Sequence, residues 1–535
     1  MTALRQSIPV LADRSSRFDG NVVANCTERL AGLCLPGAVW FIFKACFLAT
    51  PSLPHIDCSV FHRPVNCVAE FANFTNTSGA MHLHILGICG TFMGGLAALA
   101  KDMGHTVTGC DANVYPPMST QLETLGIGLH EGFDAGQLDK YPADVYVVGN
   151  AMTRGKPVIE EILNRGLRYI SGPQWLGENV LQGRWVLSVA GTHGKTTTAS
   201  MLAWILDYAG VAPGFLIGGI AKNFGISARM PKAESPFFVI EADEYDTAFF
   251  DKRSKFVHYH SRTVILNNLE YDHADIFPNI EAIETQFHHL VRTVPANGLV
   301  VANGSEAHLT NALDKGCWTP IEHFGPGMQW DFRRGAEENQ FEVRCDDKGR
   351  GTITWDLTGS HNKMNALAAI AAARHAGVPV KISIEALNQF SGVARRMEVR
   401  GIVDGVTVYD DFAHHPTAIA TTLAGLRQHV NNERIVAVLE PRSNTMKLGA
   451  MRNALPAALA AADVVFIHAH NLGWDAGETF APIGTKTGVF DNLVTLVEAV
   501  TAVAKPNDHI VVMSNGGFGG VHHLLLQALA AKAMT

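Results

Sequence analysis

Short apolar runs alternate with helical patterns along most of the chain. The first run, His82 to Leu86, precedes a glycine-rich turn, an apolar helical stretch from Leu96 to Met103, and a second run from His105 to Asp111. Apolar runs that alternate with helices in this way are typical of parallel strands buried in βαβ units. Later runs of the same kind lie at residues 145–148, 185–190, 237–240, 264–266, 406–411, 434–439, 463–468 and 509–514. The pattern therefore predicts an α/β protein.

The order of these units predicts three α/β domains in series. The expected bounds are 81–183 for a Rossmann-like first domain, 184–393 for a central domain and 394–535 for a second Rossmann-like domain. A chain of 535 residues has room for them, because one domain takes about 100–200 residues. Inside the central range, two alternating runs between Phe341 and Leu357 flank the segment Asp346 to Gly351, which predicts a β-hairpin.

Residues 1–80 differ from the rest of the chain. The apolar stretch Leu33 to Ala49 is broken by Pro36, Gly37 and Lys44 and is short for a membrane span, which takes about 20 residues. No basic segment directly precedes it, as a signal peptide would require. We interpret 1–80 as a disordered extension or an upstream translated segment with a mis-assigned start, so that the folded protein begins at Met81. A membrane anchor is the alternative.

Composition narrows the class of protein. The chain is 47% hydrophobic and 17% charged, with a formal net charge of -8. An acidic balance disfavours a nucleic-acid surface, which needs Lys and Arg to neutralise phosphates. The nine cysteines include no Cys-x-x-Cys pair and predict neither a zinc site nor a disulfide framework. We expect a cytoplasmic small-molecule enzyme without stable membrane association; the sequence does not give its oligomeric state.

A phosphate-binding loop organises the central domain. The segment after the run 185–190 offers two glycines, a lysine and a threonine before an apolar helical pattern: Gly191, Thr192, His193, Gly194, Lys195 and Thr196. Free N–H groups at a helix start bind phosphate, Lys195 reaches the outer phosphates and Thr196 offers a hydroxyl to Mg²⁺. The loop is two residues shorter than the common Walker spacing, and a glycine turn without a ligand is the alternative. Because a lysine here has little packing value, we favour a P-loop ATPase domain.

Acidic residues follow two of the later strands. Glu241 ends the run 237–240, and His273 follows the run 264–266 after two asparagines and two acids. The carboxyl ends of parallel strands are where ligands bind. Thr196 and Glu241 suit Mg²⁺, which prefers oxygen ligands, whereas an imidazole is less usual. Taken alone, His273 is more simply a loop histidine with its hydrogen bonds satisfied.

The first domain has the layout of a nucleotide-binding half. Gly87 and Gly90 follow its first strand, Asp111 ends the second, and Asn150 follows the run 145–148. Asp111 stands where a carboxylate accepts hydrogen bonds from a ribose or a uracil. The glycine spacing is not Gly-x-Gly-x-x-Gly, so NAD is the weaker interpretation and another nucleotide the stronger.

Further polar positions lie near predicted helix starts. Asn362 and Asn365 are three residues apart on one helix face, where they could hold a base edge or cap the helix. The segment 391–396 reads as a hinge with two arginines, and the run 406–411 ends in two aspartates before His414, His415 and a helix started by proline.

These motifs together resemble the Mur ligases, ATP-dependent amide-forming enzymes of peptidoglycan assembly. The resemblance runs from Met81 to the C-terminus and rests on segments 191–196, 241–246, 268–273, 359–365, 395–396 and 410–416. It implies a UDP-sugar-binding first domain, a central ATP-binding domain and an acceptor-binding third domain. It also implies that Glu241 and His273 are ligands for two Mg²⁺ ions. Asn362 and Asn365 would then meet adenine, Arg396 the phosphates and Asp411 the ribose side of ATP.

The resemblance is stronger to the members that act on UDP-N-acetylmuramate. Segments 149–155, 440–447 and 514–520 resemble those of the enzyme that joins the tripeptide L-alanyl-γ-D-glutamyl-meso-diaminopimelate to this sugar in peptidoglycan recycling. The alternative is the ligase that adds a single L-alanine. The chemistry implied is an acyl phosphate made with ATP, with Lys195, Glu241, His273, Arg396 and His415 as catalytic candidates.

The acceptor side needs its own residues. The tripeptide carries carboxylates, and Arg442 and Lys447 follow the run 434–439 on the side where an acceptor would lie. His414 or His415 is a candidate acceptor of the ammonium proton, and a phosphate oxygen is the alternative. Two rival classes, a P-loop kinase or motor and a nicotinamide oxidoreductase, leave motifs unused. A nucleotide sensor without catalysis is a third rival.

Overall fold

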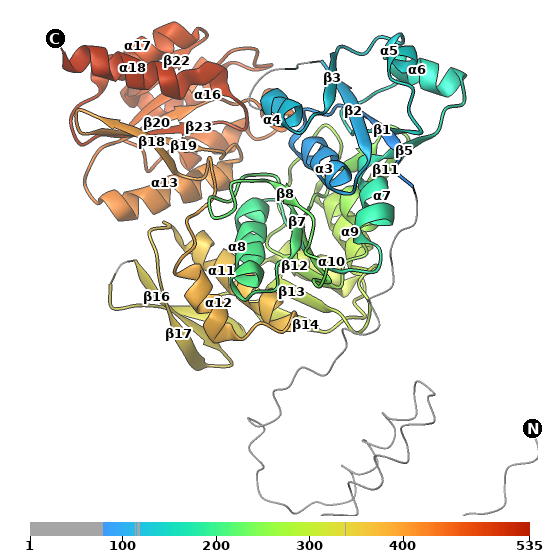
Figure 1. The fold of residues 1–535 in the computed structure, drawn as a ribbon. Helices are drawn as coiled ribbons and strands as arrows, with labels where there is room; N and C mark the ends of the chain where they lie inside the picture. Colours follow the sequence, from blue (N-terminus) through green and yellow to red (C-terminus); the bar gives the residue numbers. More distant parts are fainter. Residues whose placement is uncertain (1–78, 113, 115–117, 338, 535) are drawn as a thin grey trace, which may run out of the picture. The chain divides into compact units, whose positions relative to one another are not determined.

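The computed structural model describes residues 79–112, 114, 118–337 and 339–534. The predicted extension, except for Gly79 and Ala80, and the apolar stretch Leu33 to Ala49 lie outside the described residues. Within the described part of the chain, no helix has the length and apolar character needed to cross a membrane. The described elements form three main sheets, each flanked by helices, as the alternation of runs predicted (Figure 1).

The first sheet is fully parallel and has the order β3-β2-β1-β4-β5. Its strands are β1 (His82–Leu86), β2 (Thr106–Asp111), β3 (Gly128–Glu131), β4 (Val145–Val148) and β5 (Tyr169–Ser171). Its helices are α3 (Thr91–Asp102), α4 (Met118–Thr124), α5 (Gln137–Lys140), α6 (Pro157–Asn164), α7 (Gly172–Leu176) and the π-helical turn η3 (Gly177–Leu181). The strand order reverses between β1 and β4, which is where ligands bind in doubly wound sheets.

Helix α3 begins earlier than predicted. It starts at Thr91 instead of Leu96, so Gly94 and Gly95 belong to the helix and not to the turn. A Cβ at Gly95 would lie 2.3 Å from Leu216 Cδ1 in the central sheet. This glycine therefore allows the helix to approach a neighbouring domain, a tertiary demand that the local pattern did not reveal.

His84 on β1 gives the first domain a pH-dependent stability. The ring is fully buried; Nε2 donates to Gln137 Oε1 at 3.0 Å and Nδ1 accepts from Thr108 Oγ1 at 2.8 Å. Burial lowers the pKa of His84 from 6.5 to about 4. The unfolded chain therefore takes up a proton near pH 6.5, whereas the folded chain does so only near pH 4.

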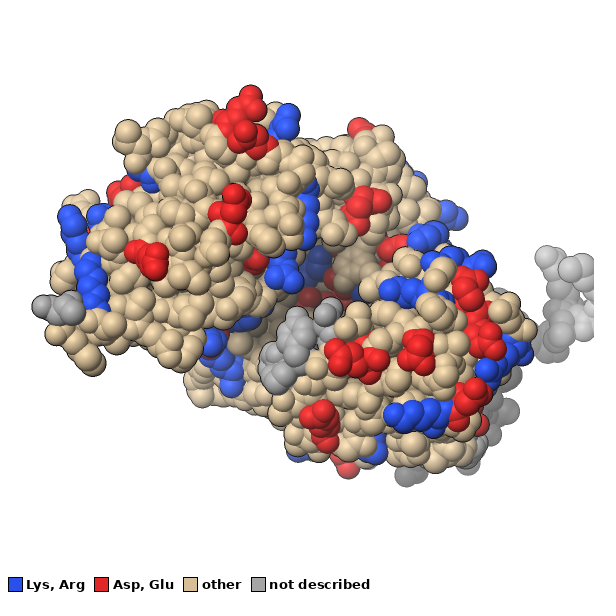
Figure 2. Space-filling model, turned by 90° about the horizontal axis from the view of Figure 1, so that it is seen from above, with Lys and Arg blue, Asp and Glu red and all other residues tan. Residues whose placement is uncertain are grey.

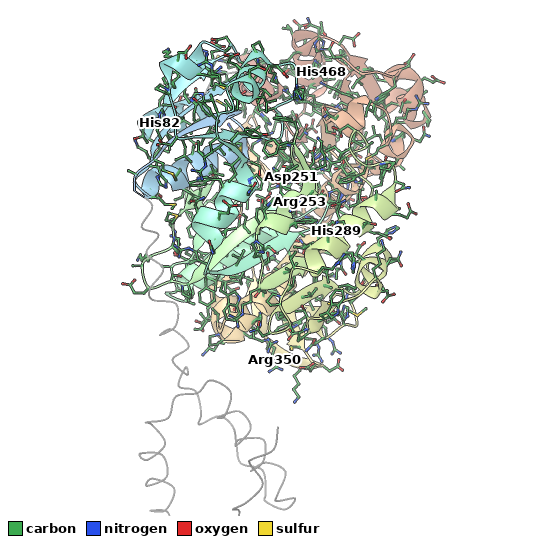
Figure 3. All side chains as sticks on the ribbon, turned by 90° about the vertical axis from the view of Figure 1, so that its right-hand side faces the viewer. His82, Asp251, Arg253, His289, Arg350 and His468 are labelled. Atoms are coloured by element: carbon green, nitrogen blue, oxygen red, sulfur yellow. The ribbon has the colours of Figure 1, made fainter. Side chains whose placement is uncertain are left out.

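The contribution of neutral His84 to the free energy of unfolding should be fully present above pH 6.5. It should be lost progressively as the pH drops towards 4. The loss from His84 is as much as about 3 kcal/mol, at 1.36 kcal/mol per unit. Urea unfolding of the parent and of His84→Gln at about pH 7.5 and pH 5 checks this, and the variant should lose part of the pH dependence. His82→Gln is the control, because His82 lies on the same strand (labelled in Figure 3). An unchanged pH dependence in His84→Gln would contradict the prediction.

The central sheet has ten strands in the order β17-β16-β15-β14-β13-β12-β6-β9-β7-β8. Its strands are β6 (Trp185–Ala190), β7 (Gly214–Leu216), β8 (Ala228–Arg229), β9 (Phe237–Ala242), β12 (Thr263–Leu266), β13 (Leu299–Asn303), β14 (Ile321–Phe324), β15 (Trp330–Arg334), β16 (Gln340–Cys345) and β17 (Lys348–Thr354). A separate ribbon is formed by β10 (Asp246–Ala248) and β11 (Asp251–Ser254). The helices are α8 (Lys195–Tyr208), η4 (Lys255–His258), α9 (Ile280–Val291), α10 (Ala307–Asp314), α11 (Ser360–His375) and α12 (Val380–Leu387). Strand β6 lies between β12 and β9, so the loop that follows it is bordered by two further strand ends.

The predicted hairpin is present, with a shorter turn than expected. β16 and β17 pair antiparallel, and the turn is made by Asp346 and Asp347, both with positive φ. Two residues with positive φ form the tight turn that matches strand twist. The hairpin lies at the sheet edge, and Arg350 on it points outward in Figure 3.

The third sheet has the order β18-β19-β23-β20-β21-β22, with only β18 antiparallel to its neighbour. Its strands are β18 (Glu398–Val403), β19 (Val406–Asp411), β20 (Ile435–Leu439), β21 (Val464–His468), β22 (Thr487–Phe490) and β23 (His509–Met513). Its helices are α13 (Pro416–Val430), α14 (Asn444–Lys447), η5 (Arg452–Ala454), α15 (Leu455–Ala458), α16 (Ala476–Phe480), η6 (Ala481–Lys486), α17 (Leu493–Val503), η7 (Phe518–Gly520) and α18 (Val521–Ala533). The segment that carries Arg442 and Lys447 is partly helical, because Ser443 accepts a hydrogen bond from Met446 N and caps α14.

The hydrophobic core is continuous between the first two sheets. One cluster of buried side chains includes Leu83 and Leu96 from the first sheet and its helix together with Phe238 and Val264 from the central sheet. The third sheet has a separate cluster on each of its faces. The first two sheets therefore share their packing, whereas the third is stabilised by its own core.

A chain that starts at Met81 should be as stable and as active as the full chain. Every described helix and strand begins at His82 or later, and none of the candidate site residues lies before Gly87. Thermal unfolding and phosphate release of the two forms, measured side by side, check this prediction. Aggregation of the shorter form, or recovery of the full chain with membranes, would give residues 1–80 a role.

Candidate functional site

The phosphate loop joins β6 to α8 in a conformation that requires glycine. Gly191 has φ 146° and Gly194, the N-cap of α8, has φ 78°. A Cβ at Gly194 would lie 2.8 Å from Asn365 Oδ1. Helix α8 begins at Lys195, directly after Gly194, so its first N–H groups face the loop. This is the arrangement that binds an anion at a helix start.

Asn268 holds the loop from the neighbouring strand end. Its Oδ1 accepts from His193 N at 2.7 Å, its Nδ2 donates to His193 O at 3.1 Å, and its carbonyl accepts from Thr192 N at 3.2 Å. The sequence analysis did not assign a role to this residue. The sequence signal that could have indicated such a role is its position shortly after β12, the strand that pairs with β6.

Lys195 has a buried partner, contrary to the expectation that it has little packing role. Its Nζ donates to Glu244 Oε2 at 3.0 Å and to Gly191 O at 2.7 Å. Burial disfavours the charged lysine, but Glu244 and Asp243 outweigh it and raise the pKa of Lys195. The lysine is therefore a fixed cation at the loop.

Carboxylates crowd the end of β9. Glu241 accepts from Gly218 N at 2.7 Å, and burial followed by the charge of Asp243 raises the pKa of Glu241 to about 7. Glu244, which the sequence analysis did not single out, links Lys195 to His273, whose Nε2 lies 3.5 Å from Glu244 Oε1. Burial opposes the charge on His273, and Glu244 outweighs it and raises the pKa of His273.

The two predicted asparagines lie in the first turns of α11, and neither caps it. The N-cap is Gly359, and no side chain accepts a hydrogen bond there. Asn362 donates to Thr358 O at 2.7 Å, while Asn365 lies against the phosphate loop and accepts from Asn267 Nδ2 at 3.3 Å. The capping alternative is thus wrong, and Asn365 is joined to the loop.

The predicted hinge brings Arg396 to the phosphate loop. Arg395 and Met397 have positive φ, and Arg396 Nη2 donates to Thr196 Oγ1 at 3.3 Å. Asp411 fixes this turn, because its carboxylate accepts from Met397 N and from Ala413 N, each at 2.8 Å. Burial lowers the pKa of Arg396 and raises that of Asp411.

In the first domain, the candidate residues gather at the strand ends where the order reverses. Gly87 has φ 81°, and Gly90 is the N-cap of α3. Asp111 Oδ2 accepts from Cys89 N at 2.9 Å, so this carboxylate also shapes the glycine turn. Asn150 is exposed and follows β4 in the chain. The residue before it, Gly149, donates from N to Leu86 O at 3.0 Å, which joins this end of β4 to β1.

Three family models match consecutive parts of the chain. They are described as the Mur ligase family catalytic domain at residues 82–184, the Mur ligase middle domain at 189–373 and the Mur ligase glutamate ligase domain at 395–516.

The chain belongs to the Mur ligase family.

Relatives within the family are similar over nearly their whole length. A UDP-N-acetylmuramate–L-alanyl-γ-D-glutamyl-meso-2,6-diaminoheptandioate ligase from Escherichia coli is 54% identical over 456 residues, 85% of this chain and 99% of the relative. A UDP-N-acetylmuramate–L-alanine ligase from Roseiflexus castenholzii is 32% identical over 477 residues, 84% of this chain and 98% of the relative. The solved structure of a murein peptide ligase from Psychrobacter arcticus is 47% identical with a TM-score of 0.68, and covers 84% of this chain and 99% of its own.

In this Mur ligase a cavity of about 300 Å³ opens beside His273. Its lining comes from the segment after β12 and from the third domain: Asp272, His273, Asp275, His414, Arg442, Ser443, Asn444, Thr445 and Asn515. Thr445 joins the two sides, since it donates to Asp272 Oδ1 at 2.8 Å and accepts from Ala274 N at 3.3 Å. Figure 2 shows a hollow on one face of the molecule with acidic and basic side chains in and around it.

The cavity separates the two predicted cations. Arg442 lines it, with Nη1 3.7 Å from Glu440 Oε1, whereas Lys447 at the end of α14 is exposed and is not among the lining residues. A larger cavity of about 700 Å³ lies elsewhere in the third domain, near Arg452 and Lys486, away from every predicted site residue. The smaller cavity is the better acceptor candidate because it adjoins the carboxylate cluster.

The two predicted histidines of the third domain face different surroundings. His414 lines the cavity, and its Nδ1 lies 3.0 Å from Phe412 O. His415 caps α13, and its Nδ1 lies 3.1 Å from His193 Nε2 of the phosphate loop. Burial is the main cause that lowers the pKa of each to about 4.

Proposed function

We propose that this Mur ligase joins the tripeptide L-alanyl-γ-D-glutamyl-meso-diaminopimelate to UDP-N-acetylmuramate, with ATP converted to ADP and phosphate. The observation that carries the proposal is the 54% identity over 99% of the E. coli ligase of that name, against 32% for the L-alanine ligase. The enzyme acts in peptidoglycan recycling. Because ATP and UDP-sugars are made in the cytoplasm, the reaction belongs there.

The ATP side is assigned to the phosphate loop and its neighbours. Gly191 to Thr196 hold the phosphates and Arg396 reaches them from the hinge, a role supported by its contact with Thr196. Asn362 and Asn365 meet the adenine, and Asp411 serves the ribose side. The UDP-sugar lies at the first domain's strand ends, near Gly87, Gly90, Asp111 and Asn150, where the reversed strand order favours a nucleotide.

Mg²⁺ fits the residues next to the loop. Glu241, Asp243 and Glu244 place three carboxylates at one strand end. Burial, and then the charge of Asp243, raise the pKa of Glu241. A divalent cation would reduce the repulsion among these carboxylates. Asn267 Oδ1 is buried at the loop without a hydrogen-bond partner. Thr196, Glu241 and His273 would hold the two Mg²⁺ ions, which would offset the repulsion between the substrate carboxylate and the γ-phosphate. His273 would have to exchange its contact with Glu244 for this role.

The chain's own residues then account for the chemistry. A carboxylate is a poor electrophile, so the lactyl carboxylate attacks the γ-phosphoryl group of ATP, ADP leaves, and an acyl phosphate forms. Lys195, held by Glu244, and Arg396, held at the hinge, are preorganised cations where charge develops. The peptide amine attacks the acyl carbon, and phosphate leaves.

The proton that the peptide ammonium loses to become the attacking amine has two candidate acceptors in the third domain. The contacts favour His414, because it lines the acceptor cavity while His415 Nδ1 faces His193 and Glu270. A pKa near 4 makes His414 a weak base in the unliganded protein, and nearby substrate anions would raise it. A phosphate oxygen is the alternative acceptor.

A phosphate-release screen tests the proposal. UDP-N-acetylmuramate and ATP are combined with L-alanine, L-alanyl-γ-D-glutamate or the tripeptide in turn. Release that depends on both the UDP-sugar and the tripeptide is expected. Release with L-alanine as efficient as with tripeptide would replace the proposal with the L-alanine ligase, and release without an amine would indicate a nucleotidase.

A further inference from the structure

Three side chains from distant segments meet beside the phosphate loop. His193 comes from the loop itself, Glu270 from the segment after β12, and His415 from the N-cap of α13 in the third domain. His193 Nε2 lies 3.1 Å from His415 Nδ1 and 3.3 Å from Glu270 Oε2, and His415 Nδ1 lies 3.3 Å from the same oxygen. The three atoms form a nearly equilateral triangle.

This triangle has the size of one face of a tetrahedral metal site. Zn²⁺ binds imidazole nitrogen at about 2.0–2.1 Å and carboxylate oxygen at about 2.0–2.2 Å. Two ligands of a tetrahedron are then about 3.3–3.5 Å apart. The observed separations of 3.1–3.3 Å lie close to this value.

Hydrogen bonding within the cluster leaves acceptors facing one another. The ring of His415 makes a hydrogen bond with the backbone of Tyr271, and its Nδ1 accepts from Thr417 N at 3.3 Å. Nδ1 is therefore unprotonated and presents a lone pair. Glu270 Oε2 is also an acceptor, and it accepts from Thr417 Oγ1 at 2.7 Å. The single proton of His193 Nε2 has to serve both acceptors. A cation at the centre would satisfy all three atoms.

The environment keeps the ligands in the form that binds metal. His415 is neutral at pH 7, since burial and His193 lower its pKa to about 4. Burial opposes the charge of Glu270, but the hydrogen bonds and charges of His193, Thr417 and His415 together outweigh it and lower the pKa of Glu270 to about 2. A ligating histidine commonly donates its other ring N–H to a carbonyl, which is the arrangement that Tyr271 offers to His415.

We infer that His193, Glu270 and His415 form a binding site for a transition-metal ion of the Zn²⁺ type. Two imidazoles and one carboxylate suit Zn²⁺ or Co²⁺, whereas Mg²⁺ requires octahedral oxygen ligands and retains water. The site is separate from Thr196, Glu241 and His273, which are assigned to Mg²⁺, and it does not depend on the proposed substrates. One coordination position stays open for water or a ligand.

The ion would fasten the third domain to the phosphate loop. Two ligands belong to the central domain and one to α13, so full coordination exists only while these segments are together. An ion that binds only this arrangement stabilises it by mass action. The side chains of His193 and Glu270 are 19% and 29% exposed, which leaves a route for an ion to enter.

Cobalt absorption tests the inference without substrates. Full-length protein freed of metal by chelator is titrated with Co²⁺ in an excess of Mg²⁺, and then with Zn²⁺. We expect visible bands typical of tetrahedral Co²⁺ that saturate at about one equivalent and disappear as Zn²⁺ displaces it. Absence of these bands, or the weak spectrum of octahedral Co²⁺, would overturn the inference.

Variants locate the ion. His193→Asn, Glu270→Gln and His415→Asn should each weaken Co²⁺ binding at least tenfold, because even outer-sphere partners contribute about 10–100-fold. His415→Asn retains an N-cap acceptor, and Glu270→Gln keeps the shape of the side chain should the other variants fail to fold. His414→Asn is the matched control, since His414 is adjacent but outside the triangle. Bands that survive all three changes, or that weaken equally in His414→Asn, would place the ion elsewhere and overturn the inference.

Discussion

Lys195→Ala should lower the turnover number by on the order of 10²-fold or more, with smaller effects on the Michaelis constants. The lysine is a cation fixed beside the phosphate loop by Glu244 and the Gly191 carbonyl. Such a preorganised charge stabilises the transition state without reorganisation, which is why its loss falls on turnover. Steady-state phosphate release with saturating ATP, UDP-sugar and tripeptide measures it. Activity within a few-fold of the parent would contradict this role.

The same variant should also be less stable, because Lys195 is not a free loop side chain. Removing it leaves the buried carboxylate of Glu244 with only His273 as a charged partner, and breaking a buried pair costs up to about 3–5 kcal/mol. Adding Glu244→Gln removes the unpaired charge and should recover much of the melting temperature without recovering turnover. This double variant separates the two effects. If it regains activity, the loss in Lys195→Ala was a folding defect.

Arg442→Ala should raise the Michaelis constant for the tripeptide by about 10- to 100-fold, while those for ATP and UDP-N-acetylmuramate stay within a few-fold. The tripeptide brings carboxylates to a protein of net charge -8, and Arg442 lines the cavity beside His273. A hydrogen bond to a charged group contributes about 1.5–3 kcal/mol, and 1.4 kcal/mol corresponds to tenfold. Initial rates at varied tripeptide concentration provide the measurement.

Two further variants make this test specific. Lys447→Ala removes a cation five residues away that does not line the cavity, and it should leave the tripeptide Michaelis constant nearly unchanged. Arg442→Lys should recover only part of the affinity, because lysine lacks the planar fork that binds a carboxylate at two points. Equal effects of Arg442→Ala and Lys447→Ala would mean that the acceptor responds to general charge and not to this cavity.

Local patterns predicted most of the strands because their causes are local. The runs 82–86, 185–190 and 406–411 are strands with those same bounds, since a β-branched apolar run bounded by turn residues has few other stable conformations. Helix starts were less well predicted. Helices α8 and α11 each begin several residues before the first apolar position because polar residues occupy their first turns, whereas two glycines interrupt the apolar pattern near the start of α3. The first turns of α8 and α11 lie at the phosphate loop, and α3 approaches the central sheet at Gly95, so hydrophobic periodicity is weak there.

The sequence by itself determined the fold class, the family and the phosphate loop, because each depends on residue types at short fixed spacing along the chain. It also named Glu241, His273, Arg396 and Arg442 without determining what each side chain contacts. Only the tertiary structure decided the partners: Lys195 with Glu244, Arg396 with Thr196, and His193 with His415, which lie 49, 200 and 222 residues apart. Contacts over such separations arise from the order of strands in a sheet and from the packing of one domain on another. No local pattern records them, which is why the carboxylate that fixes Lys195 and the His193–Glu270–His415 cluster emerged only from the folded chain.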